Sequence, residues 1–194
     1  ENWGGFCQLD ERNILVSLDI HPKLPLEGPL WLEDKTAPSR AYLKLWEAFY
    51  RTGHYPKKDE RCFELGASPG GWTWVLRKLG ARVWATDRAD LSPELMADPF
   101  IHFQKGDGFQ IKRESLPEMD WVFSDVICYP DKLWDWVQMW MEAPKPPKMV
   151  CTLKFQAETD FTTQAKFAAV PNSKLMHLFQ NKHELTWIWM PEGF

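Results

Sequence analysis

A short apolar run, a glycine-rich turn and a helical pattern follow one another directly between residues 62 and 79. The run Cys62–Leu65 leads into Gly66-Ala-Ser-Pro-Gly-Gly-Trp72, and the helical pattern continues from there. Glycine has no Cβ, so such a turn lets the backbone approach a ligand closely, and the helix N-terminus presents unpaired N–H groups. This join predicts an α/β fold with a ligand site at the carboxyl end of the first core strand.

From Cys62 onward, apolar runs alternate with helix-compatible stretches, which is typical of an α/β fold with a mainly parallel sheet. The sequence predicts strands at Cys62–Leu65, Val83–Thr86, Ile101–Gln104, Trp121–Ser124, Met149–Leu153 and Leu185–Met190. A further strand near Leu175–Phe179 would form a hairpin-like pair with the last one. Helices are expected at Gly71–Leu79, Pro93–Ala97, Lys132–Glu142 and Phe161–Ala169.

The segment before this core is less regular. Ile14–Ile20 alternates like a strand, whereas the prolines at positions 22, 25 and 29 indicate loop. An amphipathic helix is expected to follow Ser39, with Ser39 as its N-cap. We therefore divide the chain into an N-terminal segment, residues 1–36, and one domain, residues 37–194. Since the sequence does not begin with methionine, we expect it to be part of a longer protein.

Charge and cysteine usage narrow the class of protein. The net charge of −4 argues against a large, uniformly basic nucleic-acid binder. A local basic segment remains, which is either a solvated face or an RNA contact; it comprises Lys35, Arg40, Lys44, Arg51, Lys57 and Lys58. The four cysteines are scattered, without a metal-ligand spacing, and no apolar run approaches the length of about 20 residues that spans a bilayer. We expect a reduced cytoplasmic protein with no disulfide, metal or membrane segment.

The glycine turn favours S-adenosylmethionine over a dinucleotide. The dinucleotide pattern Gly-x-Gly-x-x-Gly is absent, because here three residues including Pro69 separate Gly66 from Gly70. Asp87 follows Gly66 by 21 residues, at the end of the second strand, where an acid can bind ribose hydroxyls. Asp107 follows the third strand and could accept a hydrogen bond from an adenine amino group. Taken alone, either aspartate could instead be a cap or turn residue.

Several motifs together resemble the FtsJ/RrmJ-like ribose 2′-O-methyltransferases, and within them the RlmM branch, which modifies a cytidine of large-subunit ribosomal RNA. The matching stretches are Ala37–Phe49, Glu64–Trp72, Asp107–Phe109, Ser124–Asp125, Thr152–Lys154 and His183–Leu185. The resemblance implies a Rossmann-like class I methyltransferase fold with a mainly parallel seven-stranded sheet flanked by helices. It also implies an S-adenosylmethionine site without metal, formed by Glu64, Gly66, Ala67, Ser68, Pro69, Gly70, Gly71, Trp72, Asp87, Asp107 and Asp125.

The same resemblance implies a catalytic Lys-Asp-Lys-Glu set, at Lys44, Asp125, Lys154 and Glu184. A ribose hydroxyl is a weak nucleophile, so its methylation needs a base near the oxygen and cations that stabilise alkoxide character. We expect Lys154 to be the base, Asp125 to orient it, and Lys44 to stabilise negative charge. Glu184 would hold the two lysines. Burial and a second cation favour a neutral lysine, whereas the two carboxylates favour a charged one.

Two departures affect target choice. Asp125 is followed by Val126-Ile-Cys-Tyr-Pro130 rather than by the Ala-Pro-Asn found in RrmJ, and the N-terminal RNA-binding region of the RlmM branch does not fit into 194 residues. RNA, with ribosomal RNA as the first choice, is the expected partner, contacted near Arg40, Lys44 and Arg51. Methylation of another acceptor (a base, a cap or a small molecule) and a non-catalytic scaffold that retains the cofactor pocket are the alternatives.

Overall fold

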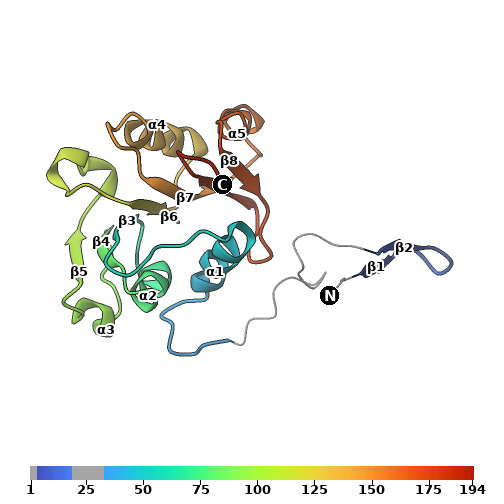
Figure 1. Cartoon of the computed structure of the whole chain (residues 1–194), viewed down its shortest axis with the longest axis horizontal. Helices are drawn as coiled ribbons and strands as arrows, with labels where there is room; N and C mark the ends of the chain where they lie inside the picture. Colours follow the sequence, from blue (N-terminus) through green and yellow to red (C-terminus); the bar gives the residue numbers. More distant parts are fainter. Residues whose placement is uncertain (1–3, 19–32) are drawn as a thin grey trace. The chain divides into compact units, whose positions relative to one another are not determined.

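The computed structural model describes residues 4–18 and 33–194, which fall into two compact units with a boundary between Glu33 and Asp34 (Figure 1). The first unit contains an antiparallel hairpin of β1 (Gly5–Gln8) and β2 (Ile14–Ser17). The strand expected over Ile14–Ile20 is thus confirmed as far as Ser17. The remainder of that range and the loop expected at positions 22, 25 and 29 lie outside the described residues.

The second unit is built on a seven-stranded sheet with the order β5-β4-β3-β6-β7-β9-β8. All strands run parallel except β9, which is antiparallel to both of its neighbours. The predicted α/β fold with a mainly parallel seven-stranded sheet is confirmed. The strands are β3 (Arg61–Leu65), β4 (Arg82–Asp87), β5 (Ile101–Lys105), β6 (Trp121–Ser124), β7 (Lys148–Lys154), β8 (Ser173–Met176) and β9 (Glu184–Trp189).

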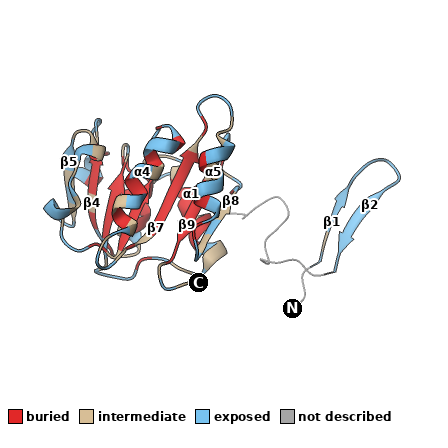
Figure 2. Ribbon diagram, turned by 90° about the horizontal axis from the view of Figure 1, so that it is seen from above, coloured by how far each residue is buried: buried red, intermediate tan, exposed pale blue. Residues whose placement is uncertain are grey.

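Helices cover both faces of this sheet, so its central strands are buried except at some of their ends (Figure 2). On one face lie α1 (Ala41–Thr52), α2 (Gly71–Lys78) and α3 (Pro93–Met96), and on the other lie α4 (Pro130–Met141) and α5 (Phe161–Ala168) (Figure 1). Alternate residues of a strand serve the two faces. Cys62 of β3 packs into the α1–α2 core, and its neighbour Phe63 into the α4 core. Burial on both faces explains why these strands are near-continuous apolar runs.

Short 3₁₀ turns, η1 (Gly108–Gln110) and η2 (Arg113–Ser115), follow β5. The predicted N-cap of α1 is wrong, because the helix begins at Ala41 with Arg40 at the N-cap and without a side-chain cap bond. Ser39 lies one residue too early and packs against Gly71 instead. The hairpin-like pair β8–β9 is confirmed, but β8 ends at Met176. Phe179 leaves the strand because its amide donates a hydrogen bond to Glu47 of α1.

Among the described residues, no helix is long and apolar enough to cross a membrane. The cysteines are free thiols. Cys62 and Cys151 lie buried in β3 and β7, as their apolar surroundings predict, whereas Cys7 is exposed.

Replacing Gly70 tests the turn that joins β3 to α2. Gly70 has φ +115, and a Cβ there would collide with Leu95 of α3. We expect Gly70→Ala to lower the free energy of unfolding by about 2 kcal/mol or more, measured by urea denaturation. Gly53→Ala is the control, because Gly53 also has a positive φ (+70) but nothing lies within 4 Å of its Cβ position. Equal losses in the two variants would show that the Leu95 contact contributes nothing.

Candidate functional site

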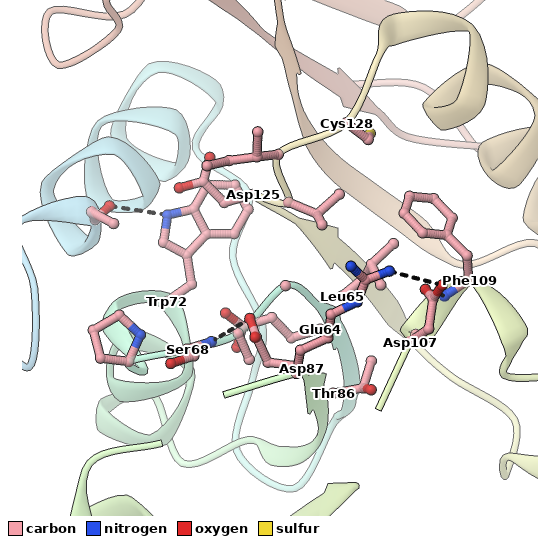
Figure 3. Close-up of a pocket in the computed structure, with 18 of the residues that line it drawn as sticks. Glu64, Leu65, Ser68, Trp72, Thr86, Asp87, Asp107, Phe109, Asp125 and Cys128 are labelled. Carbon is pink, nitrogen blue, oxygen red and sulfur yellow. Dashed lines mark hydrogen bonds and ion pairs between the residues drawn. The ribbon is translucent and has the colours of Figure 1, made fainter. Parts of the chain in front are cut away.

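A cavity of about 420 Å³ opens at the carboxyl ends of β3, β4 and β6 (Figure 3). The β3–β6 border is the point where the chain order of the sheet reverses, since β4 lies on one side of β3 and β6 on the other. Open α/β sheets bind ligands at such a switch point. The glycine turn, the loop after β5 and the loop after β6 supply the walls.

The glycine turn depends on the absence of a side chain at Gly66. Its φ is +79, and a Cβ would lie only 2.7 Å from both the Cα and the Cβ of Val126 in the loop after β6. The amides of Gly66 and Ala67 donate to the carbonyl of Thr86, at 2.9 and 3.2 Å. These contacts fix the turn against its two neighbouring strands, so the cavity wall is formed by backbone.

Asp87 and Asp107 have different local partners. Asp87 Oδ2 accepts a hydrogen bond from the amide of Ser68 at 3.0 Å, so this carboxylate holds the glycine turn (Figure 3). Asp107 caps η1 by accepting from the amide of Phe109, and it also pairs with Arg88 at 3.1 Å. The amide of Phe109, together with the Arg88 guanidinium, holds the pKa of Asp107 below its usual value. The turn-residue role weighed for Asp107 is therefore present, but both aspartates also line the cavity.

Glu64 is a buried carboxyl group on the floor of the cavity. Its exposed fraction is 1%, and Oε2 accepts a hydrogen bond from Thr73 Oγ1 at 2.5 Å. Burial raises the pKa of Glu64 to about 8 against the opposing effect of the Thr73 hydrogen bond, and the nearby Asp125 and Asp87 carboxylates raise it further. A buried carboxyl of this kind fits a ligand that brings a positive charge.

The four residues of the expected catalytic set converge at the edge of the same cavity. Lys44 Nζ lies 3.0 Å from Asp125 Oδ1 and 2.7 Å from Glu184 Oε1. Lys154 Nζ lies 3.1 Å from Asp125 Oδ1 and 2.6 Å from the backbone carbonyl of Asp125. All four side chains are less than 20% exposed. Asp125 thus links two lysines, and Lys44 links two carboxylates, in one continuous ion-paired chain.

Strand register and helix α1 bring this chain together. Lys154 ends β7 and is the direct cross-strand partner of Glu184, which begins β9. Helix α1 supplies Lys44 from the adjacent layer. One turn further along α1, Glu47 is fully buried, pairs with Arg51 at 2.7 Å and accepts the amide of Phe179 at 2.9 Å. Glu47 therefore anchors α1 to the loop that leads into Glu184.

The structure places the predicted site residues in three groups. Those that line the cavity are Glu64, Gly66, Ala67, Ser68, Pro69, Gly71, Trp72, Asp87, Asp107, Asp125 and Lys154. Lys44 and Glu184 do not line the cavity; Lys44 connects to it through Asp125, and Glu184 through Lys44 and its strand partner Lys154. Gly70 serves the turn by its positive φ and by contact with Leu95. Trp72 Nε1 donates to the Ala41 carbonyl at 3.0 Å, which ties α2 to α1.

Sequence reasoning missed several residues of the site. Cys128 lines the cavity as a buried thiol, whose pKa is raised to about 11 by burial, and Phe109 lines it beneath the ammonium of Lys132. Glu47 gave a usable signal, because it is a carboxylate on the apolar face of an amphipathic helix, three residues from Lys44. Phe109 lies in the Asp107–Phe109 stretch that carries the family resemblance, which is its signal, whereas Cys128 gave none, because only the folded loop brings it to the cavity.

A family model described as FtsJ-like methyltransferase matches residues 37–180. The chain belongs to this family. It is 30% identical over 185 residues to ribosomal RNA large subunit methyltransferase M of Halorhodospira halophila, covering 91% of this chain and 54% of the relative. It is 32% identical over 142 residues to the protein of the same name from Hahella chejuensis, covering 69% of this chain and 36% of the relative. The chain thus spans about half the length, or less, of these curated relatives.

Solved structures show the same fold at low identity. A protein of Streptococcus thermophilus described as a hemolysin superposes with a TM-score of 0.65 at 19% identity, covering 83% of this chain and 70% of that one. A Plasmodium falciparum protein described as a ribosomal RNA methyltransferase superposes with a TM-score of 0.53 at 17% identity, covering 78% and 96%. Both likenesses concern the fold alone. S-adenosylmethionine is the cofactor of the FtsJ-like family. The turn at Gly66 presents backbone without a side chain, which leaves room for the methionine end of this cofactor, and the buried Glu64 fits the positive charge of that end.

The buried Glu64 predicts a pH-dependent stability. The unfolded carboxyl has a pKa of 4.5 and the folded one of about 8, so between these values the native state binds a proton that the unfolded chain does not. This contribution to the free energy of unfolding is complete below the unfolded pKa and is lost as pH rises through the folded pKa. Urea denaturation from about pH 5 to about pH 8.5 should show it, and Glu64→Gln should remove it.

Glu158→Gln is the control for this experiment, because it removes an exposed carboxyl group. A wild-type pH profile that runs parallel to that of Glu64→Gln would contradict the burial-raised pKa of Glu64.

Proposed function

We propose that this domain transfers a methyl group from S-adenosylmethionine to a ribose 2′-hydroxyl of large-subunit ribosomal RNA. One observation carries the proposal: the ion-paired chain of Lys44, Asp125, Lys154 and Glu184 meets the cofactor cavity at Asp125 and Lys154, which both line it. Family membership and the names of the relatives in Halorhodospira halophila and Hahella chejuensis support methyl transfer to ribosomal RNA.

The cofactor would be held at three strand ends. Asp87 would bind the ribose hydroxyls, Asp107 the adenine amino group, and Glu64 with the glycine turn the methionine end; the support is that all of them line the cavity. When bound, S-adenosylmethionine supplies an electrophilic methyl group on a sulfonium. Asp87 and Asp107 already accept hydrogen bonds from backbone amides, and each carboxylate oxygen can accept more than one.

Lys154 is the group that would remove the proton from the hydroxyl. Its Nζ lies at the cavity edge, so a hydroxyl there can donate to it once the amine is neutral. The hydroxyl proton would pass to Nζ while the oxygen takes the methyl group from sulfur, with S-adenosylhomocysteine as the leaving group. The resulting ammonium would be stabilised by the Asp125 carboxylate and carbonyl, which lie at 3.1 and 2.6 Å. Asp125 thereby also fixes the direction in which Nζ points.

Lys44 and Glu184 act further from the acceptor. The Lys44 ammonium lies 3.0 Å from Asp125 and 2.7 Å from Glu184, and it thereby offsets the charge of two carboxylates that are 14% and 13% exposed. Its positive charge also favours alkoxide character on the acceptor oxygen. Glu184 holds Lys44 at 2.7 Å and is a positioning residue.

We further propose that residues 37–194 form the methyltransferase domain, that residues 1–36 are a separate segment, and that the reaction takes place in the cytoplasm. RNA contacts are assigned to the region of Arg40, Lys44 and Arg51. Of these, Lys44 is buried and Arg51 is half-buried, whereas Arg40 is exposed. The direct contribution to RNA binding should therefore be larger for Arg40 than for Arg51.

Lys154→Ala should lower methyl transfer to unmethylated large-subunit ribosomal RNA by about 10²–10⁴-fold, the usual contribution of a general base. Binding of S-adenosylhomocysteine, measured by calorimetry, should stay near wild type. Lys154→Arg separates charge from basicity, because a guanidinium keeps the positive charge but cannot accept the proton near neutral pH. It should be as inactive as the alanine variant.

Lys145→Arg provides the matched control, since Lys145 is a surface lysine paired with Glu118. Near-normal turnover of Lys154→Arg would show that Lys154 acts only by charge. Mapping of the labelled nucleotide distinguishes a 2′-O-methyl product from a methylated base. If wild-type protein binds the cofactor but methylates no RNA, this proposal is overturned in favour of a small-molecule acceptor or a non-catalytic role.

RNA affinity should fall as salt rises, because phosphate contacts release counterions. Arg40→Ala should lower the affinity for the same RNA at low salt and flatten the salt dependence, and Arg51→Ala should do so less. Fluorescence anisotropy with a labelled transcript measures both. Affinity that is insensitive to salt, or unchanged in both variants, would contradict the assigned surface.

A further inference from the structure

The loop between β6 and α4 exposes two large side chains immediately after Asp125. Ile127 is 75% and Tyr129 is 63% exposed, and Ile127 also lines the cofactor cavity. The proton transfer assigned to Lys154 and Asp125 uses neither of them. Two large side chains exposed beside a reaction centre are candidates for contact with the acceptor molecule.

The backbone under these side chains is fixed. Val126 is packed against Gly66, and Cys128 is only 8% exposed, so alternate residues of the loop point inward and outward. The carbonyl of Tyr129 accepts a hydrogen bond from the amide of Leu133 at 3.2 Å, and the buried Pro130 begins α4. Tyr129 is therefore an aromatic ring on a rigid support, which loses little conformational freedom when a ligand packs on it.

The loop is short enough to keep Tyr129 near the reaction centre. Tyr129 lies four positions after Asp125, a distance of at most about 14 Å along an extended chain. A ribose and its base are joined by a single glycosidic bond, so a 2′-hydroxyl at Lys154 brings its own base close to this loop. Proteins commonly bind the bases of unpaired RNA by stacking them on exposed aromatic rings.

We propose that Tyr129, with Ile127 beside it, forms the binding surface for the base of the nucleotide that is methylated. This inference rests on the proposed RNA ribose methylation and names the contact that holds the acceptor. Because every base has a π-face, stacking selects an unstacked nucleotide rather than a particular base. The favoured substrate is therefore single-stranded or looped RNA.

The test compares Tyr129→Ala, Tyr129→Phe and Tyr55→Ala. Tyr55 is a matched control, because it is 53% exposed and lies in the loop before the amino end of β3, whereas the cavity lies at the carboxyl end. Two quantities are measured: KM and kcat on unmethylated large-subunit ribosomal RNA, and affinity for an unstructured ten-nucleotide RNA in the presence of S-adenosylhomocysteine. Tyr129→Ala should raise KM and weaken oligonucleotide binding by about tenfold or more. Tyr129→Phe and Tyr55→Ala should behave as wild type.

Affinity for S-adenosylhomocysteine must be unchanged in all three variants, because the exposed ring of Tyr129 lies outside the cofactor contacts. If Tyr129→Ala matches Tyr55→Ala, the stacking surface is overturned while methyl transfer stands. If Tyr129→Phe is as impaired as Tyr129→Ala, the hydroxyl and not the ring makes the contact, which also overturns it. Absence of methyl transfer to any RNA by wild-type protein overturns the proposed function itself.

Discussion

Parallel pairing of β3 with both β4 and β6 is the constraint on which the site depends. In this register Leu65 lies beside Thr86 on one side and Ser124 on the other. The chain therefore leaves all three strands at the same edge, and Gly66, Asp87 and Asp125 emerge together there. Successive side chains of a strand point to opposite faces of the sheet. A slip of one residue in the pairing would therefore move every side chain of the strand to the other face and separate Gly66, Asp87 and Asp125.

Charge compensation shapes the second half of the site. Four ionisable side chains lie largely out of water, and removal of one partner from such a set leaves an uncompensated charge, which destabilises the fold. Lysines and carboxylates alternate in the ion-paired series Lys154, Asp125, Lys44 and Glu184, so each charge has a partner of opposite sign. The buried charge of Glu47 is compensated in the same way, by Arg51 and by the amide of Phe179, and these contacts connect α1 to the loop before β9. Reactivity and stability at this edge are consequently not separable by single substitutions at Lys44 or Glu184.

Glu64 and Tyr129 represent opposite uses of burial around one cavity. Glu64 is a carboxyl group buried away from water, an arrangement that a cationic ligand would stabilise. Tyr129 instead exposes an aromatic ring to solvent, where the proposed nucleic-acid base would cover it. The backbone contact between Gly66 and Val126 joins the two regions, because it packs the turn that follows Glu64 against the loop that carries Tyr129. The proposed cofactor and acceptor surfaces therefore share one wall, where Gly66 meets Val126.

The sequence alone determined the fold class, the strand order along the chain and the glycine turn, because these depend on local periodicity and on residues such as Gly66 that permit a positive φ. Resemblance to a family selected Lys44, Asp125, Lys154 and Glu184, which periodicity could not distinguish from surface residues. Tertiary structure alone decided that α1 begins after Arg40 without the Ser39 cap and that β8 ends before Phe179, since the amide of Phe179 binds Glu47, a residue 132 positions away. It also decided which side chains are buried and which oxygen each ammonium meets. Those properties arise from contacts between distant segments, which no local pattern in the chain encodes.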